Sequence, residues 1–200
     1  MRIILTDFMS IDGVVQAPGG QSEDTDGGFR HGGWSHPYFD QEAMGPLLAE
    51  EMAETAALLF GRRTWDGMAA AWPGRAGDPY ADHMNSVQKY VVSRTLTAED
   101  AASRWNNTTL IGGEDALAEV RRLRDGDGDG GIQVWGSASL ARQLVENDLV
   151  DEYRLMIEPI LLGGGKTIFP TDGNARPLEL VSVTQATTGV LICAYRPAAA

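Results

Sequence analysis

Two basic residues stand beside the start of a predicted helix, where positive charge is electrostatically unfavourable. In the stretch LLFGRRTWDGM (58–68), an apolar run ends at Phe60 and a helix is predicted from about Thr64, with Arg62 and Arg63 between them. A helix N-terminus carries about +0.5 of an elementary charge, so guanidinium groups beside it are disfavoured unless an anion joins them. The spacing therefore predicts an anion-binding site at this turn.

Three predicted strands end in polar turns of this kind. The turns are Gly61-Arg62-Arg63-Thr64, Ser93-Arg94-Thr95 and Gly136-Ser137-Ala138-Ser139. In a largely parallel sheet the strand ends lie at one edge, which is where ligands bind in open α/β folds. Two of the turns open helices with free backbone N–H groups, and three arginines come from two of them.

This arrangement suits a ligand with phosphates in two places. We expect a pyrophosphate over the Gly136 turn and a monophosphate between Arg94 and either Arg62 or Arg63, which is the charge layout of NADPH. Taken singly, each arginine is better explained by solvation or an ion pair, and Ser137 by an ordinary N-cap; their joint placement at strand ends favours a binding site. Binding of another phosphorylated ligand stays open and predicts no preference for NADPH over NADH.

The elements that position the turns alternate along most of the chain. Strands are predicted at 2–8, 58–60, 89–92, 107–111, 132–135, 151–161, 166–169, 178–186 and 190–196. A helix is predicted over 41–57. Others are predicted to begin at about 64, after 113 and at about 137, and a short one is predicted to end at about 87. The last four strands have no helices between them, and Thr188-Gly189 predicts a hairpin turn. We therefore predict an α/β fold with a mixed, mostly parallel central sheet, flanking helices and antiparallel C-terminal strands.

A long segment from Met9 to Pro37 separates the first strand from the first helix. A loop of this length inside a compact domain is usually functional or disordered. Its aromatic residues favour a folded lid or substrate wall, in which Phe29, Trp34 and Phe39 either stack on a flat substrate or pack the lid.

Composition limits the partners. The 200 residues carry a formal net charge of −12, which argues against nucleic acid and anionic membranes as partners. The 43% hydrophobic content fits one domain over 1–200. The single cysteine, Cys193, excludes an intramolecular disulfide, and Asp7 interrupts the first apolar run, so we expect a cytoplasmic location.

Three glycine-rich matches do not meet the requirements of their motifs. DGDGDGG (125–131) begins like a calcium loop but has Gly136 where the bidentate glutamate should stand. Its glycines also match the G-x-G-x-x-G spacing of dinucleotide-binding loops. That motif must follow a strand, whereas these glycines follow a predicted helix. LLGGGKT (161–167) has Ile160 in place of the first P-loop glycine, and is either a plain turn or a surface that a cofactor ring can approach. No metal site is predicted.

Several motifs resemble one family. FGRRTWDGM resembles the Gly-Arg-x-Thr-aromatic motif of dihydrofolate reductases, and VVSRTL resembles their second cofactor strand. VWGSASLARQLVENDLVDEYRLMIEPILLGGGKTIF is similar to the C-terminal half of the reductase domain of bacterial riboflavin-biosynthesis deaminase-reductases, and FMSIDGVV extends the match over nearly the whole chain. The resemblance implies a dihydrofolate-reductase-like fold, NADPH as hydride donor and commonly a homodimer.

The resemblance also implies roles for single residues. The 2′-phosphate side would be held by Arg62, Arg63, Thr64, Ser93 and Arg94, flanked by Gly61 and Thr95. The pyrophosphate would lie on Gly136, Ser137, Ala138, Ser139 and Leu140, and the nicotinamide near Asp12, Gly13 and Val14.

We therefore expect hydride transfer to a C=N or C=O carbon of a small heterocycle, either a riboflavin-pathway pyrimidine or a pterin-like compound. For the proton donor we predict Asp12, with Asp40 second, and either needs a pKa raised by burial. Asp12-Gly13 is equally typical of a plain turn.

Departures from the family pattern leave the substrate open. Val14 stands where riboflavin-pathway reductases often have lysine, the loop is longer than in folate reductases, and the zinc-deaminase signature is absent. A non-catalytic NADPH-binding or sensing dimer is the alternative function.

Overall fold

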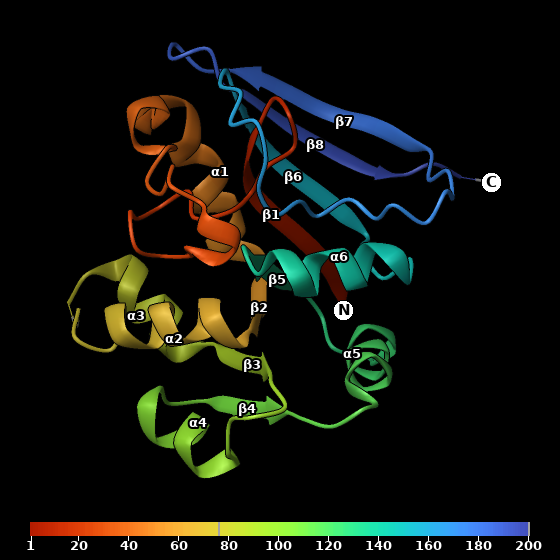
Figure 1. The fold of residues 1–200 in the computed structure, drawn as a ribbon. Coiled ribbons are helices and arrows are strands. Elements are labelled where there is room, and N and C mark those ends of the chain that lie inside the picture. Colours follow the sequence, from red (N-terminus) through yellow and green to blue (C-terminus); the bar gives the residue numbers. More distant parts are fainter. Residues whose placement is uncertain (76, 200) are drawn as a thin grey trace.

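An eight-stranded sheet crosses the molecule in the order β4-β3-β2-β5-β1-β6-β8-β7 (Figure 1). The structure is a computed structural model that describes residues 1–75 and 77–199. Its strands are β1 (Arg2–Ser10), β2 (Thr55–Gly61), β3 (Gln88–Val92), β4 (Thr108–Ile111), β5 (Gly131–Trp135), β6 (Glu152–Glu158), β7 (Leu178–Gln185) and β8 (Leu191–Pro197). Neighbouring strands from β4 to β6 pair in parallel, whereas β8 pairs antiparallel with both β6 and β7. This confirms the predicted mixed sheet.

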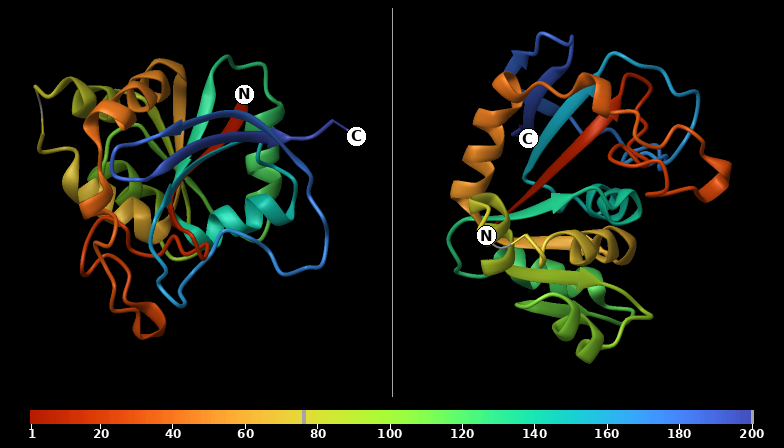
Figure 2. Two further views of the ribbon diagram at one scale, coloured as in Figure 1. Left: turned by 90° about the horizontal axis from the view of Figure 1, so that it is seen from above. Right: turned by 90° about the vertical axis from the view of Figure 1, so that its left-hand side faces the viewer.

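Helices cover both faces of the sheet (Figure 2). They are α1 (Gln41–Glu54), α2 (Arg62–Ala71), α3 (Pro79–Ser86), α4 (Ala98–Arg104), α5 (Ala116–Asp125) and α6 (Ala138–Glu146), with short 3-10 turns η1 (Asp26–Gly28) and η2 (His36–Tyr38). Within the described residues, no helix combines the length and the apolar character needed to cross a bilayer.

The side chains of β2 show how the layers are separated. Leu58 and Phe60 pack with Trp65 of α2 on one face, while Leu59 packs on the other face with Leu144 of α6. Successive side chains of a strand point to opposite faces, so one short apolar strand supplies two hydrophobic cores. Both helices that follow the predicted phosphate turns are thereby fixed to the sheet.

The strand register brings the three predicted turns to one edge. Gly61 pairs with Val92, Leu59 with Val134, and β5 then ends one residue later. The parallel arrangement predicted from the sequence is therefore the feature that aligns the turns.

Three segments differ from the sequence prediction. The helix predicted over 41–57 ends at Glu54, and β2 begins at Thr55. No strand forms at 166–169, where the chain continues as a loop between β6 and β7 after three glycines with positive φ, at 163–165. Helix α4 was not predicted, and it begins where Thr97 Oγ1 accepts a hydrogen bond from the Asp100 N–H. The predicted hairpin turn is confirmed, because the Ala186 N–H donates to the Val190 carbonyl at 2.8 Å.

A fully buried lysine of β3 contacts the C-terminal end of α3. Lys89 Nζ donates to the carbonyls of Met84, Asn85 and Val87 at 2.6–3.0 Å and lies 4.9 Å from the centre of the Trp105 ring. The last carbonyls of a helix have no partner within the helix, so the ammonium group satisfies them where water does not reach. Lys89 therefore anchors α3 beside β3.

Replacing Lys89 with Met should destabilise the protein by about 2–4 kcal/mol, because three carbonyls lose their buried donor. Urea unfolding followed by circular dichroism measures this change. Arg121→Met is the matched control, since it also removes one cation but from an exposed position on α5, and should change stability by less than about 0.5 kcal/mol. Equal stability of the two variants would contradict the anchoring role.

Candidate functional site

A cavity of about 600 Å³ opens between α1, α2, α3 and the ends of β1 and β5. Aromatic side chains from separate parts of the chain form much of its wall, namely Phe8, Phe39, Tyr80 and Trp135. The Tyr80 and Trp135 rings are nearly parallel, at 3° with centroids 6.3 Å apart. Such a wall suits a flat ring.

Glu51 of α1 is a buried carboxylic acid in this cavity. It is 1% exposed, and its Oε1 accepts a hydrogen bond of 2.5 Å from Thr6 Oγ1 of β1. Burial raises the pKa of Glu51 to about 7, although the Thr6 hydrogen bond and the charge of Arg154 oppose this shift. Glu51 can therefore hold and release a proton near neutral pH.

Asp7 of β1 is a second buried acid of the cavity. Burial raises its pKa well above the usual range, and a hydrogen bond from the Gly136 backbone opposes part of that rise. Its Oδ2 has no hydrogen-bond partner among the described residues. Unpartnered buried carboxyl atoms are rare in folded proteins, which makes Asp7 a candidate for contact with a ligand.

Glu158, at the end of β6, fixes the loop beside the cavity. Its Oε1 accepts a hydrogen bond of 2.6 Å from Ser35 Oγ, and burial raises the pKa of Glu158 to about 7. Ser35 also lines the cavity. The hydrogen bond to Glu158 thus holds Ser35 of the long loop beside the cavity.

Sequence reasoning missed these three acids, although two left a signal. Glu51 falls on the apolar face of α1 with Met44 and Leu48, and Asp7 interrupts an apolar strand. A carboxylate on a face that is otherwise buried indicates a perturbed acid.

The turns after β2 and β5 lie against each other. The Gly61 N–H donates to Ser137 Oγ at 2.9 Å, and a Cβ at Gly136 would lie 3.6 Å from the Thr64 methyl group. Neither Gly61 nor Ser137 caps its helix through a side chain. The first residues of α2 and α6 are therefore adjacent.

The three predicted arginines differ in their ion pairing. Arg62 pairs with Asp66 at 2.6 Å, and Arg63 pairs with Asp24 and Asp26, each at 2.6 Å. Arg94 is exposed, and within the described residues it forms no ion pair. It follows Ser93, whose Oγ accepts the N–H groups of residues 95 and 96 and so shapes the turn.

Neither predicted proton donor has the raised pKa that the role requires. Asp12 accepts hydrogen bonds from Ser10 Oγ and from the Leu162 and Gly163 N–H groups, and these lower its pKa. Asp40 caps α1, and hydrogen bonds from Thr187 lower its pKa. Hydrogen bonds to a carboxylate favour its charged form, so the expected burial effect is wrong for both residues.

Of the other residues predicted to contact the substrate or cofactor, one lines the cavity and the rest pack within or against loops. Phe39 lines the cavity and is 48% exposed. Trp34 is buried inside the loop, where its Nε1 donates to the Gln16 carbonyl at 2.8 Å. Gly13 and Val14 lie against the loop that follows β6, near Phe169 and Gly165.

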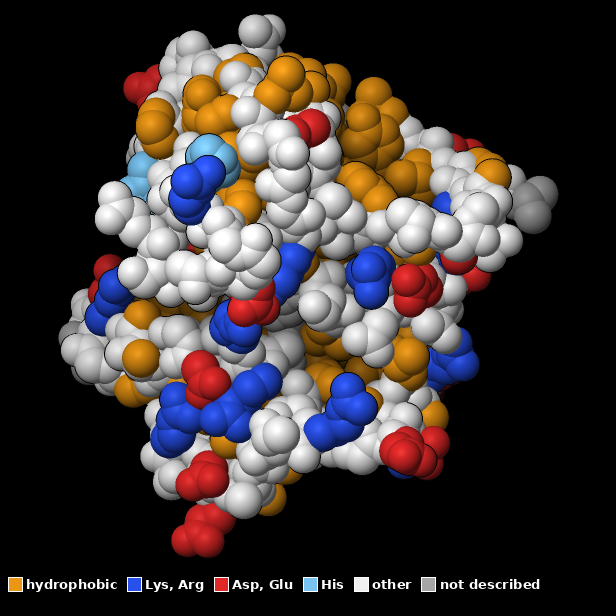
Figure 3. Space-filling view, in the orientation of Figure 1, with side chains coloured by type: hydrophobic (Ala, Val, Ile, Leu, Met, Phe, Trp, Pro, Cys, Tyr) orange, Lys and Arg blue, Asp and Glu red, His pale blue; other side chains and the backbone are white. Residues whose placement is uncertain are grey.

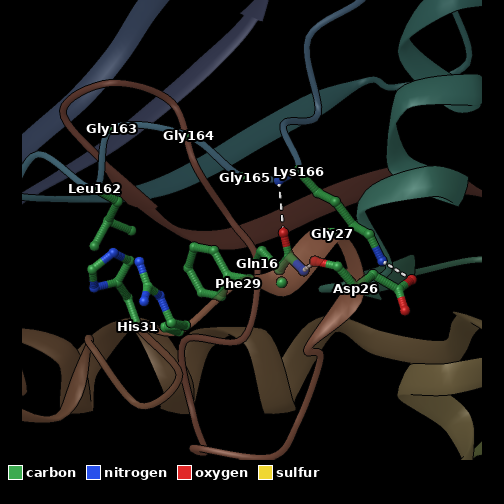
Figure 4. A pocket seen from close by; sticks show the side chains of 12 residues that line it. Gln16, Asp26, Gly27, Phe29, His31, Leu162, Gly163, Gly164, Gly165 and Lys166 are labelled. Carbon is green, nitrogen blue, oxygen red and sulfur yellow. Dashed lines mark hydrogen bonds and ion pairs between the residues drawn. The ribbon is translucent and has the colours of Figure 1, made fainter.

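A smaller cavity of about 480 Å³ lies between η1 and the glycine-rich loop (Figure 4). Phe29, His31 and Leu162 stand on one side of it, and Gln16, Asp26 and Lys166 on the other. In the described part of the chain, no cluster of three or more His, Cys, Asp or Glu could hold a metal ion.

Sequence comparison finds a family match and a relative. The RibD C-terminal domain family matches residues 1–192. YyaP, an uncharacterized protein of Bacillus subtilis, is 27% identical over 203 residues, covering 97% of this chain and 94% of YyaP.

Solved structures with the same fold include a reductase and a reductase-like protein. A putative riboflavin biosynthesis protein from Shewanella sp. PV-4 has a TM-score of 0.70 at 20% identity, and each chain is covered completely. A pyrimidine reductase-like protein from Corynebacterium diphtheriae has a TM-score of 0.63 at 14% identity, with 100% of this chain and 92% of that one covered. Dihydrofolate reductase from Enterococcus faecalis, complexed with NADP(H) and RAB-propyl, has a TM-score of 0.61 at 12% identity, with 99% and 97% covered.

Glu51→Gln should change how stability depends on pH. The pKa of Glu51 is raised to about 7 in the folded protein from 4.5, so its favourable contribution is complete below pH 4.5 and is lost as pH rises through 7. The free energy of unfolding of the variant should therefore rise relative to that of the wild type as pH rises, by about 1–3 kcal/mol at pH 8. Urea unfolding from pH 4.5 to 8 measures this difference.

Glu42→Gln, at an exposed position of the same helix, is the control. Its difference from the wild type should stay nearly constant over this pH range. Parallel profiles for Glu51→Gln and the wild type would show that Glu51 does not titrate as described.

Proposed function

This chain belongs to the RibD C-terminal domain family, and we propose that it is an NADPH-dependent reductase of a small, flat heterocycle. The observation that carries the proposal is the meeting of two uncapped helix N-termini beside a cavity with two buried acids. The first feature suits phosphates, and the second suits proton transfer to a ring. The fold shared with an NADP(H)-bound dihydrofolate reductase supports this combination.

The residues present fit a dinucleotide phosphate. A Cβ at Gly61 would approach Ser137 Oγ to 3.3 Å, so glycine keeps the surface between the two turns open. Under the proposal, the N–H groups of Arg62, Arg63 and Thr64 face one phosphate group and those of Ala138 and Ser139 face the pyrophosphate. Arg94 supplies charge for the 2′-phosphate.

NADPH, when bound, supplies the hydride. The chain positions the substrate between the aromatic walls of the cavity and excludes water with the 16–38 loop, which is fixed by Glu158 and Trp34. We place the proton on Glu51, with Asp7 as the second candidate, because both acids line the cavity and burial raises the pKa of each. The predicted donors Asp12 and Asp40 then act as loop and helix anchors.

The charge of the cavity favours a pterin-like substrate over a phosphorylated pyrimidine. Its described lining contains the acids Asp7, Glu23 and Glu51 but no lysine or arginine. Buried acids pair well with amino and ring N–H donors, whereas a substrate phosphate needs a cation.

We also propose a cytoplasmic homodimer, with β7 in the subunit contact. Leu180, Val181 and Val183 of this edge strand are 48–54% exposed. Figure 3 shows hydrophobic side chains gathered over the upper part of the molecule, where β7 lies in Figure 1. Exposed apolar side chains on a sheet edge are typical of an association surface.

Replacing Arg94 with Ala should weaken NADPH binding by about tenfold or more and leave NADH binding within about twofold, because only NADPH has the 2′-phosphate. Fluorescence titration of each nucleotide measures both constants. The control is Arg122→Ala, an exposed arginine on α5 that pairs with Glu119. An equal loss of NADPH and NADH affinity would overturn the role of Arg94.

A further inference from the structure

An acidic turn in the 16–38 loop forms ion pairs with two basic side chains that come from separate elements. Asp24 and Asp26 precede and open η1, Arg63 lies in the first turn of α2, and Lys166 follows the glycine-rich loop after β6. Both carboxylates contact both cations. The four side chains form a compact, formally neutral cluster.

The contacts are short on both cations. Arg63 Nη1 donates to Asp24 Oδ1 and Asp26 Oδ2 at 2.6 Å each, and its Nη2 donates to Asp26 Oδ1 at 3.1 Å. Lys166 Nζ donates to Asp24 Oδ2 at 2.6 Å and to Asp26 Oδ2 at 2.7 Å, and Figure 4 shows the contact with Asp26. Charge-assisted hydrogen bonds of this length are the kind that arginine and lysine make with phosphate oxygens.

Both the cations and the acids are anchored through the backbone, and Gln16 Nε2 donates to the carbonyls of Asp24 and Asp26 at 3.1 Å each. Arg63 sits in a helix that packs on the sheet, and the backbone of Lys166 is bonded on both sides, through its N–H to Gln16 Oε1 at 3.0 Å and its carbonyl to the Val15 N–H at 2.9 Å. Asp26 is 51% exposed in a three-residue 3-10 turn. Asp24 is only 15% exposed, so the Asp26 side chain is the acid of the cluster that solvent reaches and that can rotate away from the cations.

The cluster borders the proposed cofactor site. Arg63 immediately precedes Thr64, whose methyl group lies against the Gly136 turn. The two cations also keep the pKa of Asp26 low, at about 2, so the acids stay charged at neutral pH. An anion that approaches Arg63 meets negative charge already in place.

Resting on the proposed function, we propose that Arg63 and Lys166 form a phosphate-binding pair, and that Asp24 and Asp26 occupy it until a phosphoryl group displaces them. Lys166 thereby joins the binding site from a loop distant in sequence. The acidic turn lowers the affinity for phosphate, because part of the binding free energy is spent in breaking the resident ion pairs.

The double substitution Asp24→Asn with Asp26→Asn tests this. Asparagine keeps a carbonyl oxygen for the hydrogen bonds but removes the competing charge. Titration with NADPH, and separately with inorganic pyrophosphate, should give binding about tenfold tighter than in the wild type. Asp24→Asn alone should give an intermediate change, and melting curves establish that each variant is folded.

Asp127→Asn with Asp129→Asn is the matched control. It removes the same formal charge from the turn before β5. That turn lies at the N-terminal ends of the parallel strands, opposite the ends where α2 and α6 begin. This control should change either affinity by less than about twofold, because the charges are remote and screened. Adding Lys166→Met to the double variant should weaken pyrophosphate binding by about tenfold.

The outcomes separate the two proposals. Equal NADPH affinity in the wild type and the folded double variant would overturn the displacement, while the proposed function would stand. Absence of NADPH binding in every protein would overturn the proposed function, and the pyrophosphate titration would then decide the phosphate pair. Unchanged pyrophosphate binding after Lys166→Met would remove Lys166 from the site.

Discussion

The hydrogen bond from the Gly61 N–H to Ser137 Oγ is the contact on which the site depends. It joins the turns after β2 and β5, which the parallel register has already brought to one edge of the sheet. Gly136 and Ser137 both adopt left-handed backbone angles, with φ of 56° and 61°, and this sharp turn directs α6 toward the same point as α2. Serine tolerates the conformation poorly, so its hydroxyl contact with Gly61 compensates for the local strain.

Charge is distributed unevenly around this point. On the cavity side, burial raises the pKa values of Asp7 and Glu51, whereas near the turns Arg63 pairs with Asp26 and lowers the pKa of that acid. Arg154 lies beneath the cavity, 2.6 Å from Glu54 and 3.9 Å from Glu51, and limits the rise in the pKa of Glu51. Burial and ion pairing thus act on different carboxylates of one acidic chain and shift their pKa values in opposite directions.

The fold and the adjacent glycine turns after β2 and β5 could be predicted from the sequence because their signals are local. Glycine before a polar helix start, as at Gly61 and Gly136, can be recognised without knowledge of the tertiary structure. The partners of Asp12 and Asp40 lie 150 and 147 residues away, so the hydrogen bonds that lower their pKa values leave no local signal. The pairing of Arg63 with Asp24 is non-local in the same way, and the missing strand at 166–169 reflects three preceding glycines that favour a loop.

The most direct measurement is a fluorescence titration of the wild-type protein with NADPH and, separately, with NADH at low salt. The account predicts saturable binding of NADPH that is about tenfold or more tighter than that of NADH. Binding of neither nucleotide, or binding of both with equal affinity, would contradict the claim that the turns at the sheet edge hold a 2′-phosphorylated dinucleotide.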